Sequence, residues 1–476
     1  MPTPSEPSPA ATSVAPDPHA SSASTDSRAS SASTDPEAST VSRDPHAWFD
    51  AARFGLFVHF GLYALPARHE WSMSYERREV EDYRRYAEFF DPDRFDAADL
   101  ARRARKAGMR YAVLTTKHHE GFCLFESAHT DYSAPAVCGR DLVREFVDAM
   151  RAEGLRVGFY HSLLDWSHPD FTIDQNHPQR DREDVAALNS GRDMARYRAY
   201  LHAQVRELLT GYGTIDYLFF DFTDPGPDGK RPEDWDAEGL LAMVRQLQPG
   251  CVVNDRLGIP GDLVTPEQYQ PRDPMTGPDG APVRWEACQT TNGSWGYHRD
   301  NHDHKSADLL VRMLVGSVAA GGNLLLNIGP DGRGAVSPPD AEILAAIGGW
   351  MDLHAASIHG VGPADGLDAP PGTLLTARGD RLYAHLTTWP MQHVHLRGLA
   401  GRVRFARLLH DGSEVEVATV DPDQHAQNTT MDGLEPDVAT LTLPIRRPDV
   451  LLPVVELVLT DAAADGGGPS TPSWTE

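Results

Sequence analysis

The chain has 476 residues, of which 40% are hydrophobic and 24% charged, a balance typical of globular domains. This length suits two or three ordinary domains, or one large barrel followed by a smaller module. The formal net charge of −26 argues against nucleic acid or an anionic membrane as partner, because both would repel an acidic protein.

The first 43 residues differ in composition from the rest of the chain. They are rich in Ser, Ala, Thr, Pro and Asp, and the string ASSASTD begins at residue 20 and again at residue 29. Such a segment buries too little apolar area to offset its ordering entropy, so we predict a disordered tail over 1–43. It has neither the basic start nor the apolar stretch of a signal peptide, which makes a cytoplasmic location the default expectation and leaves export by another route open.

From residue 46 onward, short apolar runs alternate with amphipathic helical patterns. The predicted strands are 54–60, 111–116, 155–162, 215–220, 251–255 and 323–329. The predicted helices are 97–107, 141–154, 192–210, 236–250, 306–322 and 340–358. Strands that alternate with helices form parallel sheets through right-handed crossovers. These pairs, with the poorly patterned stretch 260–300, favour a (β/α)8-type barrel, and no GxGxxG supports a dinucleotide fold.

The pattern changes near residue 362 to short alternating runs separated by turn residues. Runs such as RLYAHLTTW, VRFARLLH and VVELVLT have the period of two that half-buried strands show. We therefore predict a C-terminal antiparallel β-sandwich. The expected organisation is a tail over 1–43, a barrel over 44–358, a sandwich over 362–463 and a frayed end over 464–476.

Polar residues gather where the predicted barrel strands end. In a barrel these ends form one face, and that face carries the active site. The residues at these ends are His59, Lys117, His118, His119, Tyr160, His161, Asp165, Asp221, Asn254, Asp255 and Arg256. Asp221 ends the apolar run YLFF, where a carboxylate is costly unless it faces a ligand. We expect neighbouring His and Arg groups to favour its charged form.

Aromatic residues accompany these polar groups, including Trp71, Trp166, Trp285 and Trp295. Aromatic planes together with His, Asp and Arg suit a sugar, which has apolar C–H faces and polar hydroxyls. The alternative for KHHEGF is a metal site, but adjacent residues on an extended chain point to opposite sides, so His118 and His119 would share one ion only if a bend follows the strand. We therefore expect no metal. The four cysteines show no CxxC spacing and are expected to be reduced thiols.

Several stretches in this order resemble the α-L-fucosidases of glycoside hydrolase family 29. They are RFGLFVHFGLYALPA, EW at 70, KHHEGF, GFYHSLLDW, IDYLFFD, VVNDR, TPEQ, WEACQTTNGSWGY and GGNLLLNIGPDGRG. The resemblance spans about 46–355 and implies a retaining enzyme that removes terminal α-L-fucose without a cofactor. It places the nucleophile at Asp221, in FFDF where the family usually has WFDG, so that Phe222 stands where Gly is common.

The same resemblance implies a set of fucose-binding residues. They are His59, Trp71, His118, His119, Tyr160 or His161, Arg256 and Trp295. The acid/base is the family's variable position, and we favour Glu267 because TPEQ follows the fifth strand and is stiffened by proline. Glu286, Asp273 and Glu70 are the alternatives. The sequence of the segment WEACQTTNGSWGYH resembles the corresponding segment of the subgroup that acts on α-1,3/4-linked fucose.

The expected partner is a fucosylated oligosaccharide or glycoconjugate. We expect no nucleic acid and no membrane, since no apolar run reaches the roughly 18 residues of a spanning helix. Two other classes compete with the glycosidase. A glycan-binding protein on an inactive barrel would keep the aromatic residues but lack one carboxylate. A metal-dependent hydrolase would bind an ion among His59, His118 and Asp221, and chelators would inactivate it.

Overall fold

The structure is a computed structural model that describes residues 44–224, 226, 228–419, 425–426, 429–430 and 436–460. Residues from Asp44 onward belong to one compact unit. The tail predicted over 1–43 and the frayed end predicted over 464–476 lie outside the described residues, so both remain predictions.

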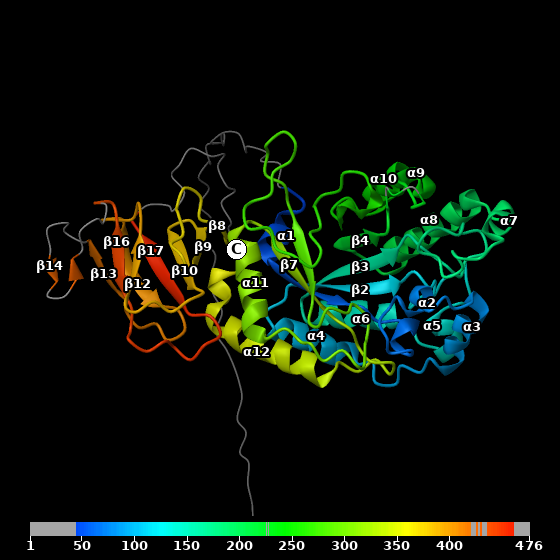
Figure 1. The fold of residues 1–476 in the computed structure, drawn as a ribbon, viewed down its shortest axis with the longest axis horizontal. Coiled ribbons are helices and arrows are strands. Elements are labelled where there is room, and N and C mark those ends of the chain that lie inside the picture. Colours follow the sequence, from blue (N-terminus) through cyan, green and yellow to red (C-terminus); the bar gives the residue numbers. More distant parts are fainter. Residues whose placement is uncertain are drawn as a thin grey trace, which may run out of the picture. The chain divides into compact units, whose positions relative to one another are not determined.

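Seven parallel strands form one curved sheet, in the order β5-β4-β3-β2-β1-β7-β6 (Figure 1). The strands are β1 (Phe54–Val58), β2 (Tyr111–Lys117), β3 (Arg156–Ser162), β4 (Tyr217–Asp221), β5 (Val252–Val253), β6 (Glu286–Thr290) and β7 (Asn323–Ile328). Each predicted run from 54 to 329 matches one of them within a few residues. Their apolar side chains are almost entirely buried, which is why these runs read as apolar without alternation.

The segment 263–267 closes the gap between the two outer strands of this sheet. Single parallel bridges join Asn254 to Leu263 on the β5 side, and Val264 to Trp285 and Glu267 to Cys288 on the β6 side. The segment therefore takes the place of an eighth strand in the barrel. Glu267 lies at its carboxyl end, on the face where the other strands end.

Helices cover the outside of the sheet. The long ones are α4 (Ala97–Lys106), α6 (Leu142–Ala152), α8 (Met194–Gly211), α10 (Ala237–Leu247), α11 (Ala307–Ala319) and α12 (Pro338–His354). The short ones are α1 (Ala47–Ala52), α2 (Ser72–Tyr75), α3 (Val80–Arg84), α5 (Ala134–Cys138), α7 (Val185–Ser190) and α9 (Pro232–Trp235). Asp96 and Asp141 begin α4 and α6 by accepting a backbone N–H three residues later, at 2.8 Å in each case.

The C-terminal part is built from antiparallel strands with a core of its own. The strands are β8 (Gly362–Pro363), β9 (Thr373–Arg378), β10 (Arg381–Leu386), β11 (His393–Leu396), β12 (Val403–Leu408), β13 (Glu416–Thr419), β14 (His425–Ala426), β15 (Thr429–Thr430), β16 (Ala439–Thr442) and β17 (Val454–Leu459). A sheet β12-β17-β10-β9-β8 faces a sheet β11-β16-β13, and Leu382, Leu441 and Leu457 are fully buried in the shared core. The predicted fold class is confirmed.

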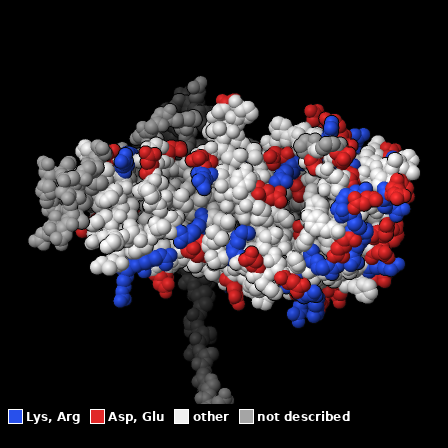
Figure 2. Space-filling model, viewed as in Figure 1, with Lys and Arg blue, Asp and Glu red and all other residues white. Residues whose placement is uncertain are grey.

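The surface carries charges of both signs. Figure 2 shows acidic side chains beside basic ones over much of the face in view. Among the described residues, no helix combines the length and apolar character that crossing a membrane requires. The charge distribution therefore gives no indication of a nucleic-acid or membrane surface on this face.

Candidate active site

The carboxyl ends of the barrel strands surround a cavity of about 330 Å³. Eight of the residues singled out in the sequence line it, from β3, from β4 and from the segments that follow the barrel strands. They are His59, Trp71, His118, Tyr160, Asp221, Arg256, Glu267 and Trp295. Glu70, one of the alternative acid/base candidates, lines it as well. The strand ends therefore form one site, as the barrel topology requires.

Arg256 contacts both carboxylates predicted from the sequence as nucleophile and acid/base, Asp221 and Glu267. Its Nη1 lies 3.2 Å from Oδ1 of Asp221, and its Nη2 lies 2.9 Å from Oε2 of Glu267. Arg256 sits in a short 3-10 helix, Asp255–Leu257, directly after β5. The side chain of Asp221 is 19% exposed and that of Glu267 is 41% exposed. One guanidinium group thus holds a buried and a more open carboxylate on the same cavity.

Burial dominates the electrostatics of Asp221. It raises the pKa of this carboxyl to about 6, although the Arg256 charge lowers it; the Glu267 charge raises it further. The Tyr160 hydroxyl donates to Oδ2 at 3.2 Å. Asp221 is therefore largely ionised at pH 7, through Arg256 and hydrogen bonds. Arg256 favours the charged form of Asp221 as expected, whereas burial keeps the imidazoles of His59 and His118 uncharged.

The histidines of the cavity are uncharged hydrogen-bonding groups. Burial lowers the pKa of His59 to about 3, and its Nδ1 lies 2.6 Å from the Asn327 side-chain oxygen. Burial also holds the pKa of His118 well below its usual range. His118 stacks on the Tyr160 ring, with centroids 5.1 Å apart, and its Nε2 lies 3.2 Å from the Tyr160 hydroxyl. Neutral imidazoles of this kind suit sugar hydroxyls, which both donate and accept.

Strand alternation separates two neighbouring candidates. Tyr160 points into the cavity, whereas His161 points to the opposite side of β3 and bonds to Thr116 through Nδ1 at 2.9 Å. Of the two candidates, Tyr160 is therefore the one that lines the cavity. His119 does not line the cavity either; it stacks on Trp166 with centroids 3.9 Å apart and lies 4.9 Å from Trp71. His119 therefore packs against Trp71, which lines the cavity, without lining the cavity itself.

Two of the four candidate acid/base residues lie away from the cavity. Glu286 begins β6, at the amino end of the barrel, where it is fully buried and accepts hydrogen bonds from the Tyr111 and Tyr217 hydroxyls. Asp273 is exposed on a loop outside the lining. Glu70 does reach the cavity, accepts the Gly296 N–H at 2.8 Å, and has its pKa raised to about 7, mainly by burial. Of the four candidates, Glu267 and Glu70 therefore share the cavity with Asp221, and Asp224 lines it as well.

Phe222, which stands where Gly is common in the family, also lines the cavity. The remaining lining residues carry no signal in the sequence; they are Phe57, Asn176, Phe219, Thr223, Asp224 and Cys288. Phe57 and Phe219 are indistinguishable from core residues in an apolar run, and Asn176 lies in a loop whose path no pattern predicts. Phe222 adopts a φ of 83°, a left-handed conformation that glycine tolerates far better than an aromatic residue. That strain lies directly beside Asp221.

One group of side chains could coordinate a metal ion. Ligand atoms of His118, His119 and Glu120 all lie within 4.8 Å of one another, and all three residues are buried. The chain turns after β2, which is the condition under which adjacent histidines could approach one ion. Yet Nε2 of His118 is engaged with Tyr160, and His119 is stacked on Trp166. Chelation of the protein tests the expectation that no metal is needed.

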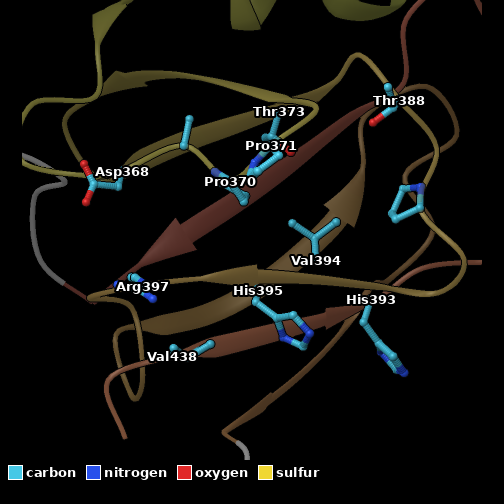
Figure 3. Close-up of a pocket in the computed structure, with 12 residues that line it drawn as sticks. Asp368, Pro370, Pro371, Thr373, Thr388, His393, Val394, His395, Arg397 and Val438 are labelled. Carbon is cyan, nitrogen blue, oxygen red and sulfur yellow. The ribbon is translucent and has the colours of Figure 1, made fainter. Parts of the chain in front are cut away.

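Another cavity, with a volume of about 480 Å³, lies in the sandwich. It is lined by residues that include Asp368, Pro370, His393, His395 and Arg397 (Figure 3). Asp368 is the one carboxylate among its lining residues. Because a glycosidase of the usual kind needs two carboxyl groups, the barrel cavity is the candidate active site.

Comparison with known proteins points to one family. A sequence description of the family Alpha-L-fucosidase matches residues 20–356. The tissue alpha-L-fucosidase of Bos taurus is 32% identical over 376 residues, which cover 72% of this chain and 75% of that protein. The tissue alpha-L-fucosidase of Homo sapiens is 31% identical over 373 residues, covering 72% of this chain and 76% of that protein.

Solved structures agree with these matches. Alpha-L-fucosidase isoenzyme 1 from Paenibacillus thiaminolyticus is 44% identical with a TM-score of 0.82, and the match covers 88% of this chain and 99% of that one. A trapped covalent intermediate of an alpha-L-fucosidase from Bacteroides thetaiotaomicron, in complex with 2-fluoro-fucosyl fluoride, is 27% identical with a TM-score of 0.74. That match covers 87% of this chain and 96% of that one.

Proposed function

The chain belongs to the alpha-L-fucosidase family of glycoside hydrolases, and from that premise we propose that Asp221 is the nucleophile and Glu267 the acid/base of its retaining hydrolysis of terminal α-L-fucose. The observation that carries this assignment is the position of Arg256, which contacts both carboxylates in one cavity. Retaining glycosidases need two carboxyl groups close together on either side of the anomeric carbon, and Arg256 lies within 3.2 Å of Asp221 and 2.9 Å of Glu267.

In the first step, an Asp221 oxygen attacks the anomeric carbon while the bond to the leaving oxygen breaks. Glu267, protonated at that stage, donates its proton to the leaving oxygen, and a fucosyl ester of Asp221 forms. In the second step, the Glu267 carboxylate takes a proton from water, the water oxygen attacks the anomeric carbon, and Asp221 leaves as a carboxylate. Two inversions give net retention.

The exposure of the two carboxyls fits these roles. Asp221 is the more buried and is ionised near neutral pH by Arg256 and by the hydrogen bond from Tyr160. Glu267 is the more open, which gives the leaving group and then water access to it. Glu70 is buried beneath the loop of Gly296 and has its pKa raised to about 7. Glu70 is therefore better placed to bond a fucose hydroxyl than to serve the leaving group.

The neutral side chains of the cavity complete a sugar site. His59 and His118 present imidazole nitrogens, and Trp71 and Trp295 present aromatic rings on the same lining. We assign His59 and His118 to fucose hydroxyls and the two indoles to its apolar faces. We also propose that the fucose is α-1,3- or α-1,4-linked. This proposal rests on the sequence of the segment WEACQTTNGSWGYH, and activity on a panel of fucosylated oligosaccharides of defined linkage tests it.

Azide tests the two carboxylates separately. Asp221→Ala should lower turnover by about 10⁴-fold, because the covalent step is lost, and azide should restore part of it as an inverted glycosyl azide. Glu267→Ala should impair natural fucosides far more than a nitrophenyl fucoside, whose leaving group needs no proton, and azide should give a retained product. If Glu70→Ala shows the second behaviour and Glu267→Ala does not, Glu70 is the acid/base.

Activity measurements also distinguish the proposed glycosidase from a glycan-binding protein and from a metal-dependent hydrolase. A glycan-binding protein on an inactive barrel would show no turnover for Asp221→Ala to reduce. A metal-dependent hydrolase would lose activity after exhaustive dialysis against EDTA and regain it with zinc. We expect full activity after that dialysis, because the proposed mechanism uses only side chains.

A further inference from the structure

A large aromatic side chain is exposed beside the mouth of the cavity. Tyr75 is the last residue of α2, and 61% of its surface is accessible. Its ring stacks on the indole of Trp71, with centroids 5.6 Å apart and the planes inclined by only 17°. Trp71 lines the cavity, so the two rings form a continuous aromatic surface from the cavity to its outer edge. Tyr75 contributes little to the core.

The structure around Tyr75 is held in place by several contacts. The His69 ring meets Tyr75 edge-on at 5.3 Å. The neighbouring Ser74 donates to the Asn176 carbonyl at 2.8 Å, and Arg180 donates to the Ser74 hydroxyl, also at 2.8 Å. These bonds tie α2 to the loop of residues 174–180. A ring held by such contacts loses little conformational entropy when a ligand stacks on it.

Asn176 adds polar groups beside this aromatic surface. Asn176 lines the cavity, and its backbone carbonyl accepts hydrogen bonds from Ser74 and Arg180. Within the part of the chain that the structure describes, the Asn176 amide group has no hydrogen-bond partner. An amide offers two donors and an acceptor, which is the complement of a pair of sugar hydroxyls.

The size of the cavity limits how much of a fucosylated substrate it can hold. A volume of about 330 Å³ is at the small end of the range for ligand sites, so a fucosylated oligosaccharide extends beyond the cavity that holds its fucose. That group bonds to the oxygen that Glu267 protonates, and Glu267, Trp71 and Asn176 line the same cavity. Whatever carries the fucose therefore lies against the rim of this cavity.

Building on the proposed function, we propose that Tyr75 and Asn176 form a subsite for the sugar to which fucose is attached. The Tyr75 ring supports the apolar C–H face of that sugar, and the Asn176 amide bonds its hydroxyls. The substrate class is then an oligosaccharide in which fucose is joined directly to a second sugar. A fucoside whose leaving group has no ring gains nothing from the subsite.

Two substrates isolate the subsite from the chemistry of the fucose itself. α-L-Fucosyl fluoride has no leaving-group sugar, whereas a fucosylated trisaccharide cleaved by the wild type has one. Tyr75→Ala should lower kcat/KM on the trisaccharide about tenfold, mainly through KM, and leave fucosyl fluoride unchanged. Tyr75→Phe should behave as the wild type because the ring remains. Phe89→Ala, which removes another exposed aromatic, 71% accessible and outside the cavity lining, is the matched control.

Inhibition by the defucosylated disaccharide gives a second measurement that does not depend on turnover. It should inhibit the wild type and Tyr75→Phe, and Tyr75→Ala and Asn176→Ala should each weaken that inhibition severalfold. Equal losses on both substrates would show that Tyr75 only supports Trp71, and unchanged kinetics with unchanged inhibition would show that no sugar contacts it. Either result overturns the subsite. A wild type inactive on fucosyl fluoride would instead overturn the proposed function.

Discussion

At the scale of single residues, the site depends on how an acidic group is kept ionised in an apolar barrel. Asp221 follows four buried residues of β4, and its pKa is raised to about 6 by burial despite Arg256. A raised pKa makes this carboxylate the stronger nucleophile, and the Arg256 charge keeps it ionised near neutral pH. The balance between burial and one guanidinium group therefore sets the working pH of the enzyme.

The acid limb of the pH profile should follow Asp221. Because this carboxylate must be ionised, kcat/KM should fall about tenfold per pH unit below pH 6. Arg256→Met removes the positive charge that lowers the pKa of Asp221, so the limb should move to higher pH. Arg284→Met, which removes an arginine paired with Asp44 and Asp50, is the control and should leave the limb in place. An unmoved limb in Arg256→Met would contradict this electrostatic account.

The backbone at Phe222 makes a second prediction at this scale. Its φ of 83° is costly for any residue with a Cβ, by about 1 to 2 kcal/mol, and nearly free for glycine. Phe222→Ala and Phe222→Gly lose the same ring, so the comparison isolates the backbone. The Gly variant should be the more stable by about 1 kcal/mol in urea unfolding. Equal stabilities would mean that the chain relaxes to another conformation here.

At the scale of elements, direction along each strand decides which residues share the site. β6 runs from Glu286 at the amino end of the barrel, where Tyr111 and Tyr217 bind it, toward Thr290. Burial raises the pKa of Glu286 to about 8, so this carboxyl is protonated in the folded protein at neutral pH and ionised in the unfolded chain. It therefore destabilises the fold increasingly between pH 4.5 and pH 8.

Glu286→Gln should separate stability from catalysis. Replacing the acid with a neutral amide should raise the unfolding temperature at pH 8, and the gain should vanish toward pH 4.5, where the wild-type carboxyl is protonated in both states. Steady-state kinetics should stay within about threefold of the wild type, because Glu286 lies outside the cavity. A large fall in kcat with full stability would restore Glu286 as an acid/base candidate.

The sequence predicts the elements well and the partners of individual side chains poorly. Apolar runs and caps such as Asp141 locate the strands and helices, because burial and capping are local. The segment 263–267 has no continuous apolar run and contains Pro266, so its strand-like role emerges only from its bridges to both neighbours. The position of Glu286 depends on tyrosines from β2 and β4, which no local pattern pairs with it.

At the scale of the whole molecule, the sandwich and the barrel share buried contacts. Trp350 in α12 donates to the Leu452 carbonyl at 2.8 Å, and Tyr383 and Val454 pack within the barrel's buried cluster. Removing the sandwich would expose this surface and leave the indole N–H without its partner. We infer that the sandwich stabilises the barrel from which the catalytic face is built.

Truncation tests this dependence. A chain that ends at residue 360 should aggregate or unfold at room temperature, because it uncovers Trp350 and the apolar side chains around it. A chain that ends at residue 463 keeps every strand of the sandwich and should retain the wild-type unfolding temperature and activity. A soluble, active barrel ending at 360 would show that the sandwich does not contribute to the stability of the site.

The central claim is that Asp221 becomes covalently bonded to fucose, and trapping that bond tests it most directly. 2-Fluoro-fucosyl fluoride forms a glycosyl ester readily but slows its hydrolysis, so the ester accumulates and can be located by mass spectrometry of proteolytic peptides. We predict one 2-fluoro-fucosyl group per chain, on the peptide that contains Asp221, and none in Asp221→Ala. A label on Glu267 or Glu70, or turnover without any label, would contradict the account.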